Sequence, residues 1–174
     1  VDALQSADIV TASTEQLLIS AGLGNDTTNV SGTGGPELTV DGGGNTTDDT
    51  LAITNTTAGT SSVSPGSTPD SGDIETPDTA NNTAFNGIEF LFLNSADPTD
   101  DLTVRGPWGG VNHIELTSGL PGNLVTVNDQ APIFLSDFDD VTLVALLGDN
   151  TITVDATSLS GVTTVDVTGS LGQD

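Results

Sequence analysis

Short runs of β-branched and aliphatic residues recur about every ten residues along the chain, with Gly, Asn, Asp and Pro between them. Such runs predict β-strands, because branched side chains fit a pleated surface, whereas Gly and Pro interrupt it. In the second half the predicted strands contain residues 102–104, 114–116, 124–127, 133–135, 141–144, 152–154 and 162–165. We therefore expect an all-β chain, which leaves a sandwich, a barrel or a solenoid as its architecture.

The spacing between alternate strands narrows this choice. Two series of apolar residues recur at nearly constant intervals: Ile114, Ile133 and Ile152 at 19 and 19, and Leu102, Leu124, Val141 and Val162 at 22, 17 and 21. In the first half, Leu17 and Leu38 are 21 residues apart, and Val30 and Ile53 are 23 apart. A repeat of about 20 residues is typical of one coil of a parallel β-solenoid, in which equivalent apolar residues stack into a continuous core. We predict such a solenoid (β-helix), with an antiparallel β-sandwich as the alternative.

Two segments depart from the strand pattern within what we expect to be a single domain or repeat unit, residues 1–174. Residues 54–84 form a Ser/Thr/Pro-rich, low-complexity insertion with Val63 and Ile74 as its only larger apolar residues. Its composition is that of a flexible linker, but a loop of this length needs the domain or a neighbouring copy to hold it. Residues 14–21 predict a short helix, because Ser13 and Gln16 have capping-box spacing.

The charge of the chain restricts its partners. Twenty-five acidic residues oppose a single Arg105 and no lysine, for a formal net charge of −24. Nucleic acid is excluded as a partner because phosphate binding needs several basic side chains. Anionic membranes also select basic patches, and no apolar stretch approaches the roughly 18 residues of a membrane span. An acidic surface attracts cations, above all Ca²⁺, which takes six to eight oxygen ligands.

Three places are candidate calcium sites. Two are clusters of three carboxylates that precede a predicted strand: Asp97, Asp100 and Asp101, and Asp137, Asp139 and Asp140. Carboxylates this close repel one another unless water or a cation neutralises them, so each cluster is either a solvated turn or a cation site. The third is Asp26, in the run Gly22-Leu-Gly-Asn-Asp26, whose residues also suit an ordinary turn.

The amino-acid composition indicates the compartment in which the protein functions. It contains no Cys and no Met, hence no disulfide and no oxidisable sulfur. The lack of lysine and the lone Arg105 also leave little for trypsin-like proteases, which suits a long-lived extracellular protein. Five N-x-S/T sequons, which an Asn- and Thr-rich chain also produces by chance, are candidate glycosylation sites: Asn25, Asn29, Asn45, Asn55 and Asn81.

Catalysis finds little support in the sequence. Arg105, Trp108 and His113 lie within nine residues. Arg105 could act as a base beside calcium on a polysaccharide, but stacking on Trp108 or pairing with a carboxylate is the simpler role. There is no Ser/His/Asp order, zinc spacing or phosphate loop. We expect no enzyme, although carboxylate pairs of the kind that hydrolyse glycosides remain open among 25 acids.

Several phrases resemble the repeats of very large secreted bacterial surface proteins, as found in planctomycetes and cyanobacteria, and the calcium repeats of RTX proteins. They are Gly22-Leu-Gly-Asn-Asp26, Glu37-Leu-Thr-Val-Asp-Gly-Gly-Gly44, Thr47-Asp-Asp-Thr-Leu-Ala-Ile53, Gly87-Ile-Glu-Phe-Leu-Phe-Leu93 and Asp100-Asp-Leu-Thr-Val104. The resemblance implies a secreted, repeated or polymerising structural protein that is often stabilised by calcium. The calcium phrases are incomplete in this chain.

The sequence thus predicts a non-catalytic structural subunit or repeat of an extracellular filament, sheath or surface layer. Its partners would be copies of itself, added through β-strand contacts at an open edge. Two alternatives remain. One is a calcium-dependent adhesin that binds surface glycans near Trp108, and the other is an enzyme acting on polysaccharides.

Overall fold

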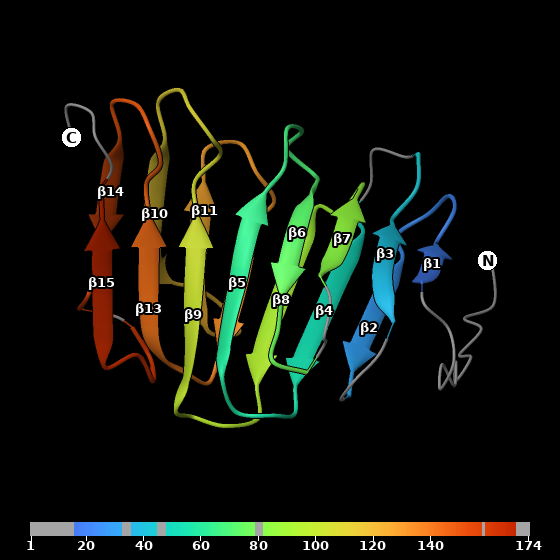
Figure 1. The fold of residues 1–174 in the computed structure, drawn as a ribbon, viewed down its shortest axis with the longest axis horizontal. Coiled ribbons are helices and arrows are strands. Elements are labelled where there is room, and N and C mark those ends of the chain that lie inside the picture. The colour runs from blue at the N-terminus through green and yellow to red at the C-terminus, as the bar shows by residue number, and fades with distance from the viewer. Residues whose placement is uncertain (1–15, 33–35, 45–47, 79–81, 158, 170–174) are drawn as a thin grey trace.

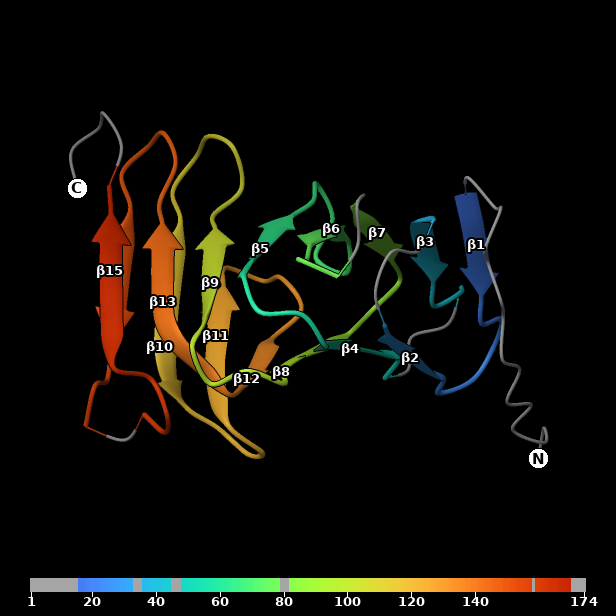
Figure 2. The ribbon, with the colours of Figure 1, turned by 60° about the horizontal axis from the view of Figure 1, so that its bottom comes forward.

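A computed structural model of the chain describes residues 16–32, 36–44, 48–78, 82–157 and 159–169. Across these ranges the protein is all-β and contains no helix, which confirms the predicted fold class. Fifteen strands form two sheets that face each other (Figure 1), and neither sheet closes into a barrel. Figure 2 shows that strand direction turns along the long axis, as expected from the twist of β-sheets.

The first layer is an eight-stranded sheet, in the spatial order β1 (Gln16–Ser20), β3 (Glu37–Asp41), β7 (Thr83–Asn86), β6 (Gly72–Glu75), β5 (Thr60–Pro65), β9 (Asp100–Arg105), β13 (Phe138–Val144) and β15 (Thr164–Thr168). The second is a seven-stranded sheet, in the order β14 (Thr151–Val154), β10 (His113–Ser118), β11 (Asn123–Val127), β12 (Ile133–Ser136), β8 (Phe90–Ser95), β4 (Thr50–Asn55) and β2 (Thr27–Ser31).

The chain passes back and forth between the two sheets. From β1 to β5, and again from β7 to β10 and from β12 to β15, each strand lies in the opposite sheet from the one before it. Among the described residues nine strand pairs are parallel and four are antiparallel, so both sheets are mixed. The antiparallel pairs all belong to two three-stranded meanders, β5–β6–β7 and β10–β11–β12.

Rows of aligned side chains build the core between the sheets. One row crosses the whole eight-stranded sheet: Leu17, Leu38, Thr83, Ile74, Val63, Val104, Leu143 and Val167. A second crosses the seven-stranded sheet: Val154, Leu116, Val125, Ile133, Leu91, Leu51 and Thr28. Alternate residues of each strand face inward, so the sheets share one aliphatic cluster.

Two of the predicted spacings correspond to real ladder positions. Leu17 is paired with Leu38, and Val30 with Ile53, each across a parallel pair of neighbouring strands. These pairs come from the part of the chain where every strand switches sheet. The intervals of 21 and 23 residues therefore measure one passage through both sheets.

The prediction that residues 19 positions apart stack on neighbouring strands is only partly correct. Ile114 is paired with Ile152 in parallel, whereas Ile133 lies on β12, two strands away from β10. In the other series Leu102 is paired with Val141, but Leu124 belongs to the opposite sheet and Val162 precedes β15. The cause is the meander β10–β11–β12, whose hairpins have nearly the same length as a passage between sheets.

The helix predicted for residues 14–21 is wrong where it can be compared. Residues 16–20 form β1, which pairs with β3 along its full length. Leu17 and Ile19 alternate toward the core, and this burial outweighs the local capping signal, as tertiary contacts often do. The proposed cap residue, Ser13, lies outside the described residues.

The Ser/Thr/Pro-rich segment 54–84 contributes strands to the sheet. It supplies β5, β6 and the start of β7, which together fill the eight-stranded sheet between β3 and β9. Val63 and Ile74, its two larger apolar residues, are paired with each other and are fully buried. The described parts of this segment therefore belong to the core layer.

The described residues hold no helix of the length and apolarity that a membrane crossing requires.

Candidate functional site

Acidic side chains link successive turns where the chain crosses from the eight-stranded to the seven-stranded sheet. Asp26, Asp49 and Glu89 each stand directly before a strand of the seven-stranded sheet, and those strands are neighbours. Oδ1 of Asp49 accepts the backbone N–H of Asp26 at 2.7 Å, and Oε2 of Glu89 accepts the backbone N–H of Asp49 at 2.7 Å. The stack satisfies backbone donors that lie just outside the strand ladder.

The Asp26–Asp49 step, by which we mean the contact between these two residues, leaves carboxylate oxygens without hydrogen-bond partners. Asp49 is only 1 % exposed, and Oδ2 of both Asp26 and Asp49 is buried without a hydrogen-bond partner. Burial raises the pKa of Asp49 above its ordinary value, and the nearby carboxylates of Asp26 and Asp48 act in the same direction. The hydrogen bond from Asp26 opposes this shift without cancelling it. A buried carboxylate in the state of Asp49 favours the uptake of a proton or a cation.

A second turn in the chain shows the same shape with a different side chain. Residues 21–27 read Ala-Gly-Leu-Gly-Asn-Asp-Thr, and residues 145–151 read Ala-Leu-Leu-Gly-Asp-Asn-Thr. The fourth residue of each is a glycine with nearly the same positive φ, 132° at Gly24 and 135° at Gly148. The sixth residue is Asp26 in the first turn and Asn150 in the second.

The amide of Asn150 forms hydrogen bonds through both its oxygen and its nitrogen, whereas Asp26 and Asp49 each have one carboxylate oxygen without a partner. Its Oδ1 accepts the backbone N–H of Asn112 at 3.0 Å, just as Asp49 accepts that of Asp26. Its Nδ2 donates to the carbonyl oxygens of Leu146 at 2.6 Å and Gly148 at 3.0 Å. In the acidic link Asp49 has the role of Asn150, and a carboxylate has a second oxygen in place of the amide nitrogen, so this oxygen has no donor beside it.

Two further buried acids serve the opposite corner, where the chain returns to the eight-stranded sheet. Oδ1 of Asp100 accepts the backbone N–H of Gly59 at 2.7 Å, and its Oδ2 accepts the hydroxyl of Ser95. Asp78 accepts the backbone N–H of Thr56 and, at 3.0 Å, its hydroxyl. Burial raises the pKa of Asp78, but the hydrogen bonds from Thr57 and Thr56 outweigh burial and lower it overall.

The three aspartates of the first predicted calcium cluster have different structural roles. Asp97 closes a local turn, where the hydroxyl and N–H of Thr99 lower its pKa. Asp100 faces inward and is 1 % exposed, whereas Asp101 faces solvent. The alternation of side chains along β9 thus separates the two adjacent carboxylates.

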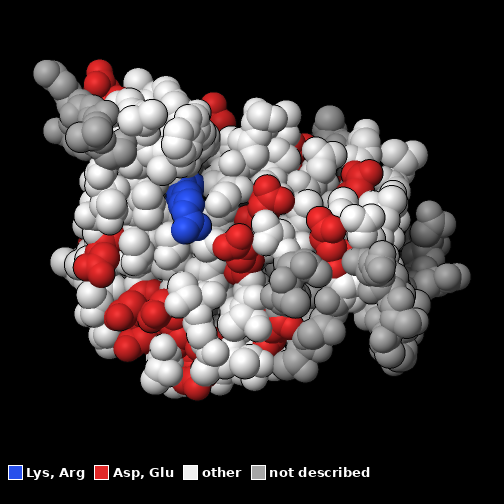
Figure 3. Space-filling model, in the orientation of Figure 1, with Lys and Arg blue, Asp and Glu red and all other residues white. Residues whose placement is uncertain are grey.

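The second cluster lies beside the first. Asp137 has a φ of 64°, and its Oδ2 accepts the hydroxyl of Ser136 at 2.9 Å. Asp139 falls at an irregularity in the pairing of β13 with β9, and Asp140 is the strand partner of Asp101. Acidic side chains gather on this face among uncharged ones (Figure 3). Nevertheless, within the described ranges no three acidic or histidine side chains form a group suited to hold a metal ion.

The predicted glycosylation sites have different environments. Asn25 and Asn29 are exposed, in the turn before β2 and on β2. Asn55 is 2 % exposed, and its Nδ2 donates to the hydroxyl of Ser61 at 2.6 Å, so the folded chain leaves no room for a glycan there. Asn45 and Asn81 lie outside the described residues.

Arg105, Trp108 and His113 lie at the end of β9, in the following loop and at the start of β10. Trp108 is 79 % exposed. The backbone N–H of His113 is held by Oδ1 of Asn128 at 2.7 Å. Trp108 and His113 are therefore exposed to solvent, whereas Arg105 is partly buried.

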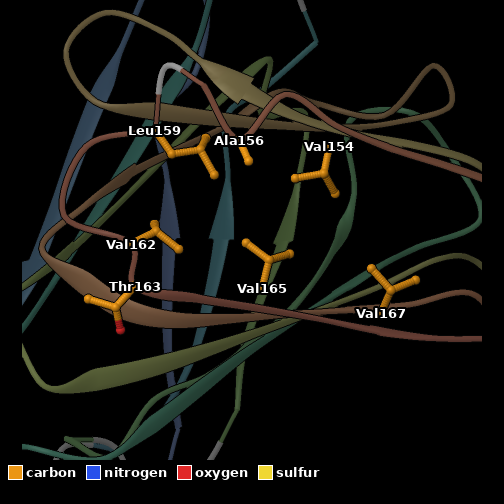
Figure 4. Close-up of a pocket in the computed structure, with 7 residues that line it drawn as sticks. All are labelled: Val154, Ala156, Leu159, Val162, Thr163, Val165 and Val167. Carbon is orange, nitrogen blue, oxygen red and sulfur yellow. The ribbon is translucent and has the colours of Figure 1, made fainter.

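The apolar interior reaches the surface at both ends of the sheet pair. At one end Leu17, Ile19 and Val30 are only partly buried. At the other, β14 and β15 and the loop between them enclose an apolar hollow of about 500 Å³ (Figure 4), lined by Val154, Ala156, Leu159, Val162, Thr163, Val165 and Val167. The side chains from the two strands face each other across this hollow. Sequence reasoning foresaw an open edge but not its position.

Compared with protein-family models, curated proteins and solved structures, the chain matches none of them.

Proposed function

We propose that the protein is a non-catalytic structural subunit or repeat of an extracellular filament, sheath or surface layer. The observation that supports this most directly is the apolar interior left open at both ends, between sheets whose edge strands have no further strand partner among the described residues. An exposed edge strand of a sheet with an apolar face can pair with a strand of another molecule. The units of such an assembly would continue the eight-stranded sheet from one copy into the next.

In this proposal the fold is a two-sheet parallel β-solenoid interrupted by two meanders. One coil is a passage through both sheets, such as β1 to β3 or β2 to β4, and strands one coil apart are parallel and in register. A β-sandwich shares the two facing layers. The parallel register between successive passages favours the solenoid, because strands of a sandwich are mostly connected by antiparallel turns.

The distribution of acids supports a structural role. The three most deeply buried carboxylates, Asp49, Asp78 and Asp100, each hold a backbone N–H that lies 22 to 41 residues away in the sequence. Carboxylates used in this way stabilise turns against their neighbours. The remaining acids keep a protein with a charge of −24 soluble, as suits a protein facing the medium outside the cell.

Calcium is the cation that this proposal assigns to the Asp26–Asp49 step. Two buried carboxylate oxygens without partners fit a hard cation that prefers oxygen ligands. Bound there, calcium would neutralise the two carboxylates, whereas the related link has no such charge because Asn150 is a neutral amide whose N–H groups donate to carbonyl oxygens. Asp26 and Asp49 would hold the ion and would thereby fasten β2 to β4.

Electron microscopy of native material, purified with calcium present, tests the proposed function. We expect extended assemblies whose building block has the dimensions of one chain. Sedimentation of the same material should give species far larger than a 17.5 kDa monomer. A homogeneous soluble monomer in native, calcium-replete preparations would rule the proposal out.

The exposure of Trp108 favours a second candidate, a calcium-dependent adhesin that binds surface glycans. Sugar rings stack on exposed aromatic faces, and a loop with Gly109 and Gly110 at positive φ presents this one. Binding to a glycan array that disappears in Trp108→Ala, while the fold is retained, would support it. Equal binding by both proteins would exclude it.

A further inference from the structure

We propose that the end formed by β14 and β15 binds the opposite end, β1 and β2, of a second copy, so that copies join head to tail. In this contact β15 pairs in parallel with β1 of the next copy, and the apolar hollow at β15 receives residues of the second copy's β1. The inference rests on the proposed function and specifies its contact. A contact between two different surfaces leads to an open chain of copies, whereas a contact between identical surfaces closes as a dimer.

Strand direction fits a head-to-tail contact. β15 is parallel to β13, and β1 is parallel to β3. Apart from β6, every strand of the eight-stranded sheet has the same direction, because each parallel pair preserves it and the meander reverses it twice. Placing β1 beside β15 therefore extends the sheet with the pairing that dominates inside it.

The register of the core rows specifies which residues would meet. Leu17 and Val167 terminate the same row of inward side chains at opposite edges of the sheet. Continuation of that row puts Val167, which is 53 % exposed, beside Leu17 of the next copy. On the outer face the same register brings Asp166 to Gln16. Nε2 of Gln16 already donates to Glu37 at 2.9 Å, and its second hydrogen would be directed at Asp166.

The charge on the two ends also permits contact between copies. In a chain of charge −24, like-charged surfaces would keep copies apart. The four end strands β1, β2, β14 and β15 carry a single acidic residue, Asp166. They also lack Lys and Pro, with which natural proteins protect exposed edges.

The turn before β2 has the backbone conformation of a turn that packs against a neighbouring turn. A Cβ on Gly148 would lie 1.6 Å from the carbonyl oxygen of Gly110, in the neighbouring turn. Gly24 has the same position and nearly the same φ in its own turn, but a Cβ there would meet no described atom within 4 Å. This turn thus has the backbone conformation of a turn that packs against another one, and no described atom lies within 4 Å of a Cβ built on Gly24.

The two sheets end unevenly, with eight strands against seven. Adding β1 to β15 leaves one strand position, about 4.8 Å wide, between β14 and β2 of the second copy.

Disulfide capture between two variants tests the contact. The chain has no cysteine, so Leu18→Cys and Thr168→Cys each introduce a single thiol, both on exposed outer-face positions that the register would make neighbours. The variants are equilibrated separately and mixed in a thiol–disulfide buffer under assembly conditions, then separated on a non-reducing gel. We expect disulfide-linked dimers in the mixture and monomers in each variant alone. Asp166→Cys mixed with Leu18→Cys, two residues out of register, should cross-link far less.

Each other outcome overturns the inference. Cross-linking of Thr168→Cys or Leu18→Cys by itself would show contact between identical ends. Absence of cross-links while microscopy shows assemblies of the same variants would place the contact elsewhere and leave the proposed function standing. Absence of both cross-links and assemblies would remove the inference together with the proposed function.

Discussion

Asp49 and Asp26 are joined by a 2.7 Å hydrogen bond from the backbone N–H of Asp26 to the carboxylate of Asp49, and both side chains keep a buried oxygen without a partner. The corresponding link between Asn150 and Asn112 is made at 3.0 Å by an amide whose nitrogen is fully used. One chain thus contains an acidic and a neutral version of the same turn-to-turn link.

Replacing Asp49 by Asn should stabilise the protein at neutral pH when calcium is chelated. Burial raises the pKa of Asp49 above its ordinary 3.8, so the folded chain holds this proton more tightly than the unfolded chain. The associated stability is complete below pH 3.8 and is lost as pH rises through the raised pKa. Asp49→Asn removes the charge and should raise the free energy of unfolding by about 1 kcal/mol at pH 7.

Urea unfolding of both proteins at pH 4 and pH 7, in the presence of a chelator, measures this effect. The advantage of Asp49→Asn should be larger at pH 7 than at pH 4. A pH-independent difference would contradict the assignment. The reverse change, Asn150→Asp, is the matched control, because it removes the N–H donors to Leu146 and Gly148 and should cost about 1–3 kcal/mol.

Calcium should stabilise the unmodified protein through the Asp26–Asp49 step. At a free concentration 100 times its dissociation constant, an ion bound only to the folded chain adds about 2.7 kcal/mol. Asp26→Asn should abolish this gain, whereas Asp101→Asn, on the exposed outer face, should preserve it. Calorimetric melting with Ca²⁺, with Mg²⁺ and with chelator provides the measurement. An equal gain in both variants would assign the effect to general screening of the charge.

Asp100 and Asp101 are adjacent in sequence, but removal of their carboxylates should change the stability of the protein by very different amounts. Asp100→Ala leaves the buried N–H of Gly59 and hydroxyl of Ser95 without their acceptor, which should cost about 2–3 kcal/mol. Asp101→Ala removes an exposed charge beside Asp140 and should change stability by less than about 0.5 kcal/mol. Denaturant midpoints of the two variants distinguish these roles; equal losses would mean that Asp100 has no special function.

Gly148 and Gly24 share a conformation but differ in their surroundings. Alanine at either position has to adopt an unfavourable positive φ, at a cost of about 1–2 kcal/mol. At position 148 its Cβ would also collide with the backbone of Gly110, so Gly148→Ala should be clearly the more destabilising in the isolated chain. Thermal melting of the two variants tests this ranking. The ranking fails if both lose the same stability.

Local patterns were sufficient to locate the strands of the second half of the chain. Every predicted strand of the second half overlaps an observed one, because alternating apolar residues between turn formers leave little freedom in local conformation. The pairing of Leu17 with Leu38 was also readable, since nothing interrupts the passage through both sheets between them. The position of Ile133 was not, because a hairpin and a passage between sheets have nearly equal lengths in this chain.

The candidate site was found only in part. Asp26 was recognised from its glycine-rich turn, but Asp49 was missed. A signal existed, since Asp26, Asp49 and Asn150 each precede a threonine that opens a strand of the seven-stranded sheet. In the first acidic cluster, sequence proximity hides the alternation that turns Asp100 inward and Asp101 outward.

The sequence by itself determined the all-β class, the strands of the second half and the charge, because these depend on composition and on residues close together in the chain. Only the tertiary structure decided which strands are neighbours, that the Ser/Thr/Pro-rich segment fills a sheet, and that Asp26 meets Asp49. These outcomes depend on contacts between residues 20 to 45 positions apart. Burial of the shared core selects among such contacts, and no local pattern records that choice.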